Sequence, residues 1–95
     1  MDGKKILEVI EIYRRHLDGH KVDPIDYPHD QYVRSSEKVC GHCFGMLDKM
    51  AEFVRDNRID KAFRWLGFIQ GCFWSLGCYT LEELKNHSRP SDEEI

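Results

Sequence analysis

Cysteines are the residues of this 95-residue sequence whose type and spacing could most directly do chemistry. Cys40 and Cys43 form a CxxC pair, and two thiolates three residues apart can face one zinc ion. Cys72 and Cys78 would complete a tetrahedral set of four ligands. They are six residues apart, which turns them about 120° from each other on a continuous helix, so this set requires the chain to swing round after Gly77. The alternative, which we favour, is that all four thiols pack as small apolar groups.

Basic residues suggest a second kind of site, one for an anion. Arg64 lies in a strongly apolar segment with Lys61 three residues before it, and a buried guanidinium needs a carboxylate or phosphate partner. Structural pairing with an acidic side chain of another helix is the first explanation. The second is a ligand site in which Arg64 and Lys61 supply positive charge and Gln70 adds a polar contact.

The segment 20–34 interleaves aromatic and basic residues, a pattern that can stack on a base and hold a phosphate. In such a site Tyr32 would supply the stacking surface, and Arg34 would add a positive charge to those of Arg64 and Lys61. Three aspartates in the same segment dilute its positive field. The alternative is a solvated loop that docks its tyrosines onto the rest of the protein.

Acidic residues give a third hypothesis, a magnesium site. All-α nucleotide pyrophosphatases hold magnesium with ExxE and ExxD pairs on helices, and Glu8 and Glu11 have the first of these spacings. No ExxD pair follows in the later helical segments, which weakens this hypothesis. His42 flanks an apolar stripe, and we interpret it as a hydrogen-bonded core residue. The sequence has no GxSxG, Walker A or HExxH pattern, so we expect a non-catalytic protein that uses no cofactor.

The charge balance narrows the class of partner. The chain carries 14 Lys and Arg against 17 Asp and Glu, for a formal net charge of -3, which argues against a protein that coats nucleic acid. Charged residues interrupt the apolar ones in residues 1–17, so this segment is no signal peptide and we expect a cytoplasmic protein. The run 65–81 has no charged side chain, but it contains a glutamine and three glycines. We interpret it as a buried helix and expect no membrane contact.

Apolar residues recur at three- and four-residue spacing along most of the chain, which predicts an all-α helical bundle. Three main helices are expected, over residues 4–17, 36–57 and 58–76, followed by a short helix over 81–87. The second and third should pair as an antiparallel hairpin. Candidate ends and caps are Ser35 or Ser36, Asn57, Gly77 and the capping-box pair Thr80 and Glu83.

These helices predict one domain over residues 1–87. The segment 18–35 contains two prolines and shows no helical or strand period, so we expect a long loop there. The C-terminal residues 88–95 are polar and acidic, and we expect a flexible tail.

The third helix carries more apolar surface than a chain of this length can easily cover. Three large aromatic residues, Phe63, Phe68 and Trp74, lie outside its main apolar face. A stripe of small residues at four-residue spacing also runs along it, formed by Gly67, Gly71 and Ser75. One explanation is packing within the chain, against small residues of the second helix at positions 40, 41 and 45. The other is a self-association surface, and we predict a homo-oligomer that uses the three aromatic residues.

The segment Lys61–Gly71, KAFRWLGFIQG, and its continuation FWSLGCYTLEELKNHSRP resemble small uncharacterised helical proteins encoded by tailed bacteriophages and prophages. The run Asp30–Asp48, which includes His42, fits the same pattern. The resemblance implies a small accessory protein in the bacterial cytoplasm, with no activity attached. Phage accessory proteins of this size often act by binding, either to host enzymes or to nucleotide signals of host defence.

We therefore predict a non-catalytic accessory protein that binds a host protein or a nucleotide-type ligand as a homo-oligomer. Two alternatives from other classes remain. One is a zinc-binding regulatory protein that uses Cys40 and Cys43. The other is a divergent magnesium-dependent nucleotide pyrophosphatase that uses Glu8 and Glu11.

Overall fold

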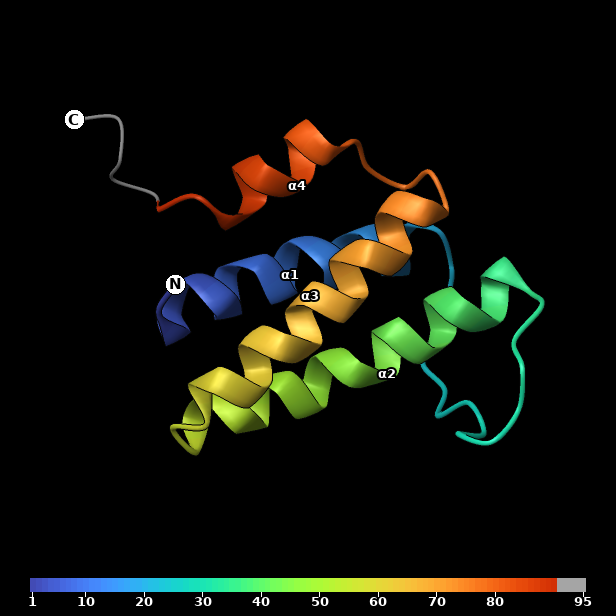
Figure 1. Cartoon of the computed structure of the whole chain (residues 1–95), viewed down its shortest axis with the longest axis horizontal. Coiled ribbons are helices and arrows are strands. Elements are labelled where there is room, and N and C mark those ends of the chain that lie inside the picture. Colours follow the sequence, from blue (N-terminus) through green and yellow to red (C-terminus); the bar gives the residue numbers. More distant parts are fainter. Residues whose placement is uncertain (91–95) are drawn as a thin grey trace.

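The computed structural model describes residues 1–90 as an all-α domain (Figure 1). Its helices are, in chain order, α1 (Gly3–Gly19), α2 (Ser36–Arg55), α3 (Ile59–Ser75) and α4 (Leu81–Ser88). No strand occurs among these 90 residues. The predicted fold of three main helices and a short C-terminal helix is therefore confirmed. Residues 91–95, which make up most of the predicted acidic tail, lie outside the described part of the chain.

The helices α2 and α3 run in opposite directions from a shared tight turn, and α1 packs against both (Figure 1). In the turn, Asn57 adopts a left-handed backbone with φ of 60°. The next residue, Arg58, donates its backbone N–H to the carbonyl of Phe53 at 2.7 Å. Asparagine tolerates this conformation better than most residues, so the predicted hairpin follows from a local sequence signal.

Side-chain caps fix where α1, α2 and α4 begin. The Asp2 carboxylate caps α1 at 2.9 Å, and the Ser35 hydroxyl caps α2 at 3.3 Å, each accepting from the backbone N–H three residues on. The predicted capping box begins α4: Thr80 accepts from the Glu83 N–H at 3.1 Å, and the Glu83 carboxylate accepts from the Thr80 N–H at 2.9 Å. A cap contributes about 1 kcal/mol, which matters most for the eight-residue α4 because short helices are marginal alone.

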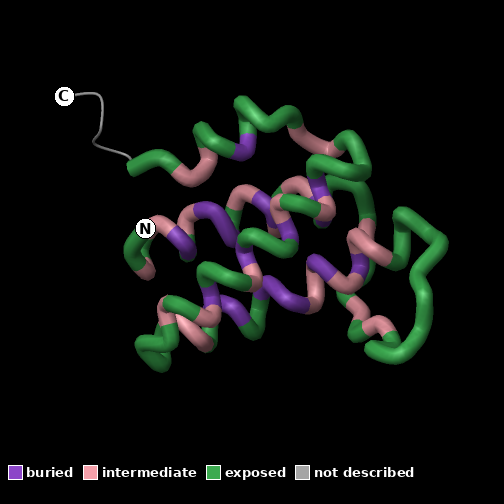
Figure 2. Tube along the Cα trace, in the orientation of Figure 1, coloured by how far each residue is buried: buried purple, intermediate pink, exposed green. Residues whose placement is uncertain are grey.

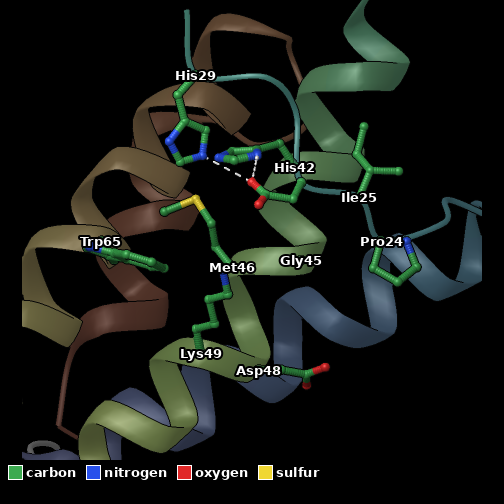
Figure 3. Close-up of a pocket in the computed structure, with 10 residues that line it drawn as sticks. Pro24, Ile25, His29, His42, Gly45, Met46, Asp48, Lys49 and Trp65 are labelled. Atoms are coloured by element: carbon green, nitrogen blue, oxygen red, sulfur yellow. Dashed lines mark hydrogen bonds and ion pairs between the residues drawn. The ribbon is translucent and has the colours of Figure 1, made fainter.

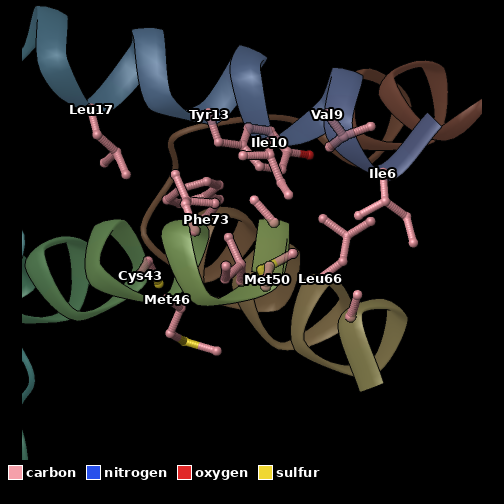
Figure 4. Close-up of a cluster of buried hydrophobic side chains, with 14 of the residues drawn as sticks. Ile6, Val9, Ile10, Tyr13, Leu17, Cys43, Met46, Met50, Leu66 and Phe73 are labelled. Carbon is pink, nitrogen blue, oxygen red and sulfur yellow. The ribbon is translucent and has the colours of Figure 1, made fainter. Parts of the chain in front are cut away.

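One face of each long helix builds a shared core (Figures 2 and 4). The rings of Tyr13 and Phe73 meet edge to face at its centre, with 5.0 Å between centroids, a geometry worth about 1 kcal/mol beyond the burial of the rings. The other large, fully buried side chains are aliphatic or sulfur-containing: Ile6, Val9, Leu17, Cys43, Leu47, Met50, Leu66 and Ile69.

The hydroxyl of Tyr13 ties α4 to the rest of the domain. Gln70 Nε2 donates to the Tyr13 oxygen at 3.0 Å and to Ser88 Oγ at 3.1 Å. The Tyr13 oxygen also lies 3.1 Å from His87 Nδ1. Burial raises the pKa of Tyr13 to about 12, so its hydroxyl stays neutral. Side chains from α1, α3 and α4 thus share one hydrogen-bonded group.

The side of α3 that faces away from the core is open (Figure 2). Phe63, Phe68 and Trp74 expose 47%, 55% and 54% of their surface, as expected for aromatic residues outside the buried stripe. A Cβ added to Gly67 or Gly71 would meet no atom within 4 Å. We call these five residues the α3 outer face. No helix within residues 1–90 is long and apolar enough to cross a membrane.

Two expectations about packing are wrong. Arg64 is exposed rather than buried, because it is two residues from both Ala62 and Leu66 and so lies about 200° round the helix from each of them. The small residues of α2 also do not meet those of α3. Instead, Gly41 and Gly45 face the loop that precedes α2.

Candidate functional site

The loop between α1 and α2, residues 20–35, lies directly on the backbone of α2. Ile25 donates its N–H to the carbonyl of Gly41 at 3.0 Å. A Cβ on Gly41 would stand 2.9 Å from the carbonyl oxygen of Asp23, and a Cβ on Gly45 would collide with the carbonyl oxygen of Ile25. Two glycines one turn apart therefore allow the loop to approach the helix, and this contact positions the loop residues that follow.

Three ionisable side chains meet where the loop crosses α2 (Figure 3). His29 Nε2 lies 3.1 Å from Asp26 Oδ1, and His42 Nδ1 lies 3.9 Å from the same oxygen. The backbone N–H of Tyr27 donates to His42 Nδ1 at 3.1 Å. Neutral His42 therefore carries its proton on Nε2, which makes the far edge of the ring a hydrogen-bond donor.

Two hollows flank this histidine pair. The first has a volume of about 460 Å³ and is walled by the loop, by α2 and by Trp65 of α3 (Figure 3). The second has a volume of about 490 Å³, is also lined by His29 and His42, and extends to Phe68. We call the two hollows together the histidine groove. Each is of the size that holds a small organic ligand.

Charges around the first hollow are arranged so that one ammonium group faces it. The hydrogen bond from His29 holds the pKa of Asp26 below its usual value, and the charge of Lys49 acts in the same direction. Asp48 also borders the hollow, but Arg14 of α1 holds its carboxylate at 2.8 Å. The ammonium of Lys49 is therefore the positive group that a ligand in this hollow would meet.

The aromatic wall of the first hollow is held by its neighbours. Trp65 meets Phe53 edge to face, with 4.9 Å between ring centroids. The ammonium of Lys61 lies 4.6 Å from the centroid of Phe53 and 5.9 Å from that of Trp65. Such cation–π contacts are worth about 0.5–1 kcal/mol at exposed sites, so Lys61 has a structural role beside this wall.

The residues predicted to bind an anion do not form one cluster. Lys61 and Arg64 line an open hollow at the start of α3. Tyr32, 90% exposed, and Arg34 lie in the loop at the opposite end of the α2–α3 hairpin (Figure 1). Gln70 follows Arg64 by six residues, which turns it to another face of α3, where its amide contacts Tyr13 and Ser88.

The cysteines and the Glu8–Glu11 pair, which the sequence offered as metal ligands, do not converge on one point as metal ligands do. Within residues 1–90, no group of three or more His, Cys, Asp or Glu side chains is placed to hold a metal ion. Glu8 Oε2 lies 3.3 Å from Lys5 Nζ, and the Glu11 carboxylate lies 3.7 Å from Arg14 Nε and 3.4 Å from Arg15 Nε. The cysteines are free thiols. The zinc and magnesium hypotheses thus gain no support from the geometry.

Sequence reasoning missed three residues that line the histidine groove: His29, Lys49 and Trp65. One signal existed for the loop contact, because Gly41 and Gly45 lie one turn apart on a predicted helix. The loop sequence has no helical or strand period, so the point at which it contacts α2 cannot be predicted from the sequence.

No known protein family, curated protein or solved structure matches this chain. The chemistry of the histidine groove is therefore described from its own residues. It combines one aromatic wall, one ammonium group and two imidazoles with apolar side chains of Ile25 and Met46. Two carboxylates also border the groove, and each has a basic partner: Asp26 contacts His29, and Asp48 contacts Arg14. This combination suits a planar molecule that is rich in hydrogen-bond acceptors.

Proposed function

We propose that this chain is a non-catalytic accessory protein of the phage type that binds a small nucleotide-type ligand in the histidine groove. The observation that carries this proposal is the first hollow, which brings Trp65, Lys49 and the His29–His42 pair around one cavity (Figure 3). A host protein is the other partner that the resemblance to phage proteins implies. The experiment below separates the two partners.

Each group in the groove matches one part of a nucleotide. The half-buried ring of Trp65 offers a surface on which a base can stack, an interaction worth about 1–3 kcal/mol per base. The ammonium of Lys49 supplies a point charge for a phosphate. The Nε2–H of His42 can donate to a phosphate or base oxygen. Aromatic stacking and charge together favour a nucleotide over a simple inorganic anion.

The length of the groove favours a ligand with more than one ring. The second hollow continues past the histidines to Phe68, whose ring is 55% exposed. A ligand with two bases can therefore place one base against Trp65 in the first hollow and the other in the second hollow. A cyclic dinucleotide has this form, with phosphates between its two bases.

Isothermal titration of the purified chain with AMP, cyclic AMP and cyclic di-AMP tests the ligand proposal. We expect cyclic di-AMP to bind, and Lys49→Gln to weaken its binding by about tenfold or more, a loss of about 1.4 kcal/mol. The matched control is Lys4→Gln, which removes an exposed ammonium from the first turn of α1 and should bind as the wild type does.

Two results would contradict the ligand proposal. If none of the three nucleotides binds the folded protein, the ligand proposal fails and a host protein becomes the partner to test. If Lys49→Gln and Lys4→Gln bind cyclic di-AMP equally well, the ligand lies outside the histidine groove.

We further propose that the protein works as a homodimer through the α3 outer face. An antiparallel pair of α3 helices, related by a two-fold axis level with Ile69, sets Gly67 of one copy against Gly71 of the other. The same axis brings Phe63 level with the second copy's Ser75 and next to its Trp74, and sets the two Phe68 rings side by side. Small residues at the centre allow close approach, and the aromatic residues around them bury apolar surface.

A further inference from the structure

The four cysteines come together at one end of the α2–α3 hairpin. Cys40 and Cys43 lie near the start of α2, and Cys72 lies in the last turn of α3. Gly77, with φ of 77°, ends α3 and turns the chain back, so that Cys78 donates its backbone N–H to a carbonyl of α3 at 2.8 Å. The swing after Gly77 that a cysteine cluster requires is therefore present.

The thiols of this cluster are arranged as two pairs. The side chain of Cys43 lies beside that of Cys72, and the side chain of Cys40 lies beside that of Cys78. Each pair joins α2 either to α3 or to the turn that follows α3. Neighbouring thiols on facing segments are the first requirement for a disulfide, whereas a tetrahedral metal site needs four ligands that converge.

Burial distinguishes the two pairs. Cys43 of the inner pair is 1% exposed, whereas its neighbour Cys72 and both cysteines of the outer pair are partly exposed. Burial also raises the pKa of the thiols of Cys40, Cys43 and Cys72, which keeps them protonated near neutral pH and slows unspecific oxidation. A small reagent can therefore reach both thiols of the outer pair but only one thiol of the inner pair.

We propose that Cys40 and Cys78 are a modification site, which forms a reversible disulfide by exchange with a low-molecular-weight disulfide such as glutathione disulfide. One of the two thiolates attacks a sulfur of glutathione disulfide, releases one glutathione thiolate and leaves a mixed disulfide on the protein. The thiolate of the other cysteine then attacks the protein sulfur of that mixed disulfide and releases the second glutathione. Two protein thiols are oxidised, one glutathione disulfide is reduced to two thiols, and the protons pass to the released thiolates.

The bond would change the molecule next to the histidine groove. It ties the turn after α3 to the start of α2, close to the hollow that Val39, Phe68 and Cys72 line. It also closes a long loop of chain, which restricts the unfolded state. The oxidised protein should therefore melt at a higher temperature than the reduced protein, and dithiothreitol should reverse the change.

The full chain carrying Cys43→Ala and Cys72→Ala keeps the outer pair alone and tests the proposal. It is equilibrated in glutathione redox buffers, its remaining thiols are blocked with iodoacetamide, and its intact mass is measured. We expect the mass to fall by two hydrogens, with no glutathione attached. The matched control carries Cys40→Ala and Cys72→Ala and so keeps the diagonal pair Cys43 and Cys78. We expect it to need about a tenfold more oxidising glutathione ratio, or to end as a glutathione adduct.

Equal disulfide formation by the two double variants overturns the proposal, as does a glutathione adduct without a disulfide in the outer-pair variant. If either double variant fails to fold, the wild-type chain is oxidised and digested, and its linked peptides are sequenced by tandem mass spectrometry. A Cys40–Cys78 link then supports the proposal. A Cys40–Cys43 link, or the absence of any link, overturns it.

Discussion

At the scale of single residues, burial beside Tyr13 favours the neutral form of His87. The Tyr13 oxygen accepts from Gln70 and lies 3.1 Å from His87 Nδ1. Desolvation by burial lowers the pKa of His87 below its ordinary value of 6.5.

Mild acid should therefore destabilise the protein. In the unfolded chain His87 takes up a proton near its ordinary pKa, whereas in the folded chain it does so only at lower pH. The unfolded state thus binds more protons in this window, and stability is lost as the pH falls through 6.5 and below. His16, whose pKa is lowered by burial and by His20, acts with the same sign.

The measurement is the free energy of unfolding in urea at about pH 7.5 and about pH 5.5, above the range in which carboxylates titrate. We expect a smaller value at the lower pH. The variant His87→Asn keeps an acceptor for the Tyr13 hydroxyl but cannot titrate, so its pH dependence should be reduced. An unfolding free energy that is the same at both pH values, or a full pH dependence in His87→Asn, would show that His87 does not contribute.

At the scale of the helices, the same substitution should have opposite effects on α2 and α3. Gly71→Ala adds a methyl group where no atom lies within 4 Å, so it should stabilise the monomer by about 1 kcal/mol through helix propensity. Gly45→Ala drives a methyl group into the carbonyl of Ile25 and should destabilise it by about 1–3 kcal/mol.

Urea unfolding of both variants at low protein concentration checks this pair of predictions. A destabilised Gly71→Ala protein would mean that the α3 outer face is packed within the chain. An unaffected Gly45→Ala protein would mean that the loop does not rest on α2 in solution.

The sequence predicted those features that depend on local signals. Asn57 and Gly77 adopt positive φ, and Thr80 and Glu83 form the capping box, at the positions the sequence indicated. Arg64 could also have been assigned to the exposed face from its helical angle alone. The histidine groove could not be predicted, because it depends on where a loop without a period meets α2. The inward turn of Gln70 depends in the same way on a contact with Tyr13, 57 residues earlier.

At the scale of the whole molecule, three exposed aromatic residues share one face of one helix. Phe63, Phe68 and Trp74 lie on the α3 outer face, around two glycines at which an added Cβ would meet no atom within 4 Å. A glycine inside a helix costs about 1 kcal/mol relative to alanine. A second copy that covers this face would explain both the two destabilising glycines and the three exposed aromatic rings.

We therefore expect native mass spectrometry of the untagged chain to show a dimer, and sedimentation equilibrium to give its dissociation constant. Phe68→Ser should raise this constant by about tenfold or more. Leu81→Ser is the matched control, because Leu81 of α4 is 54% exposed against 55% for Phe68 but lies off the α3 outer face. A monomer at every concentration, or an equal effect of the two substitutions, would rule out this dimer and leave the aromatic face for a different protein.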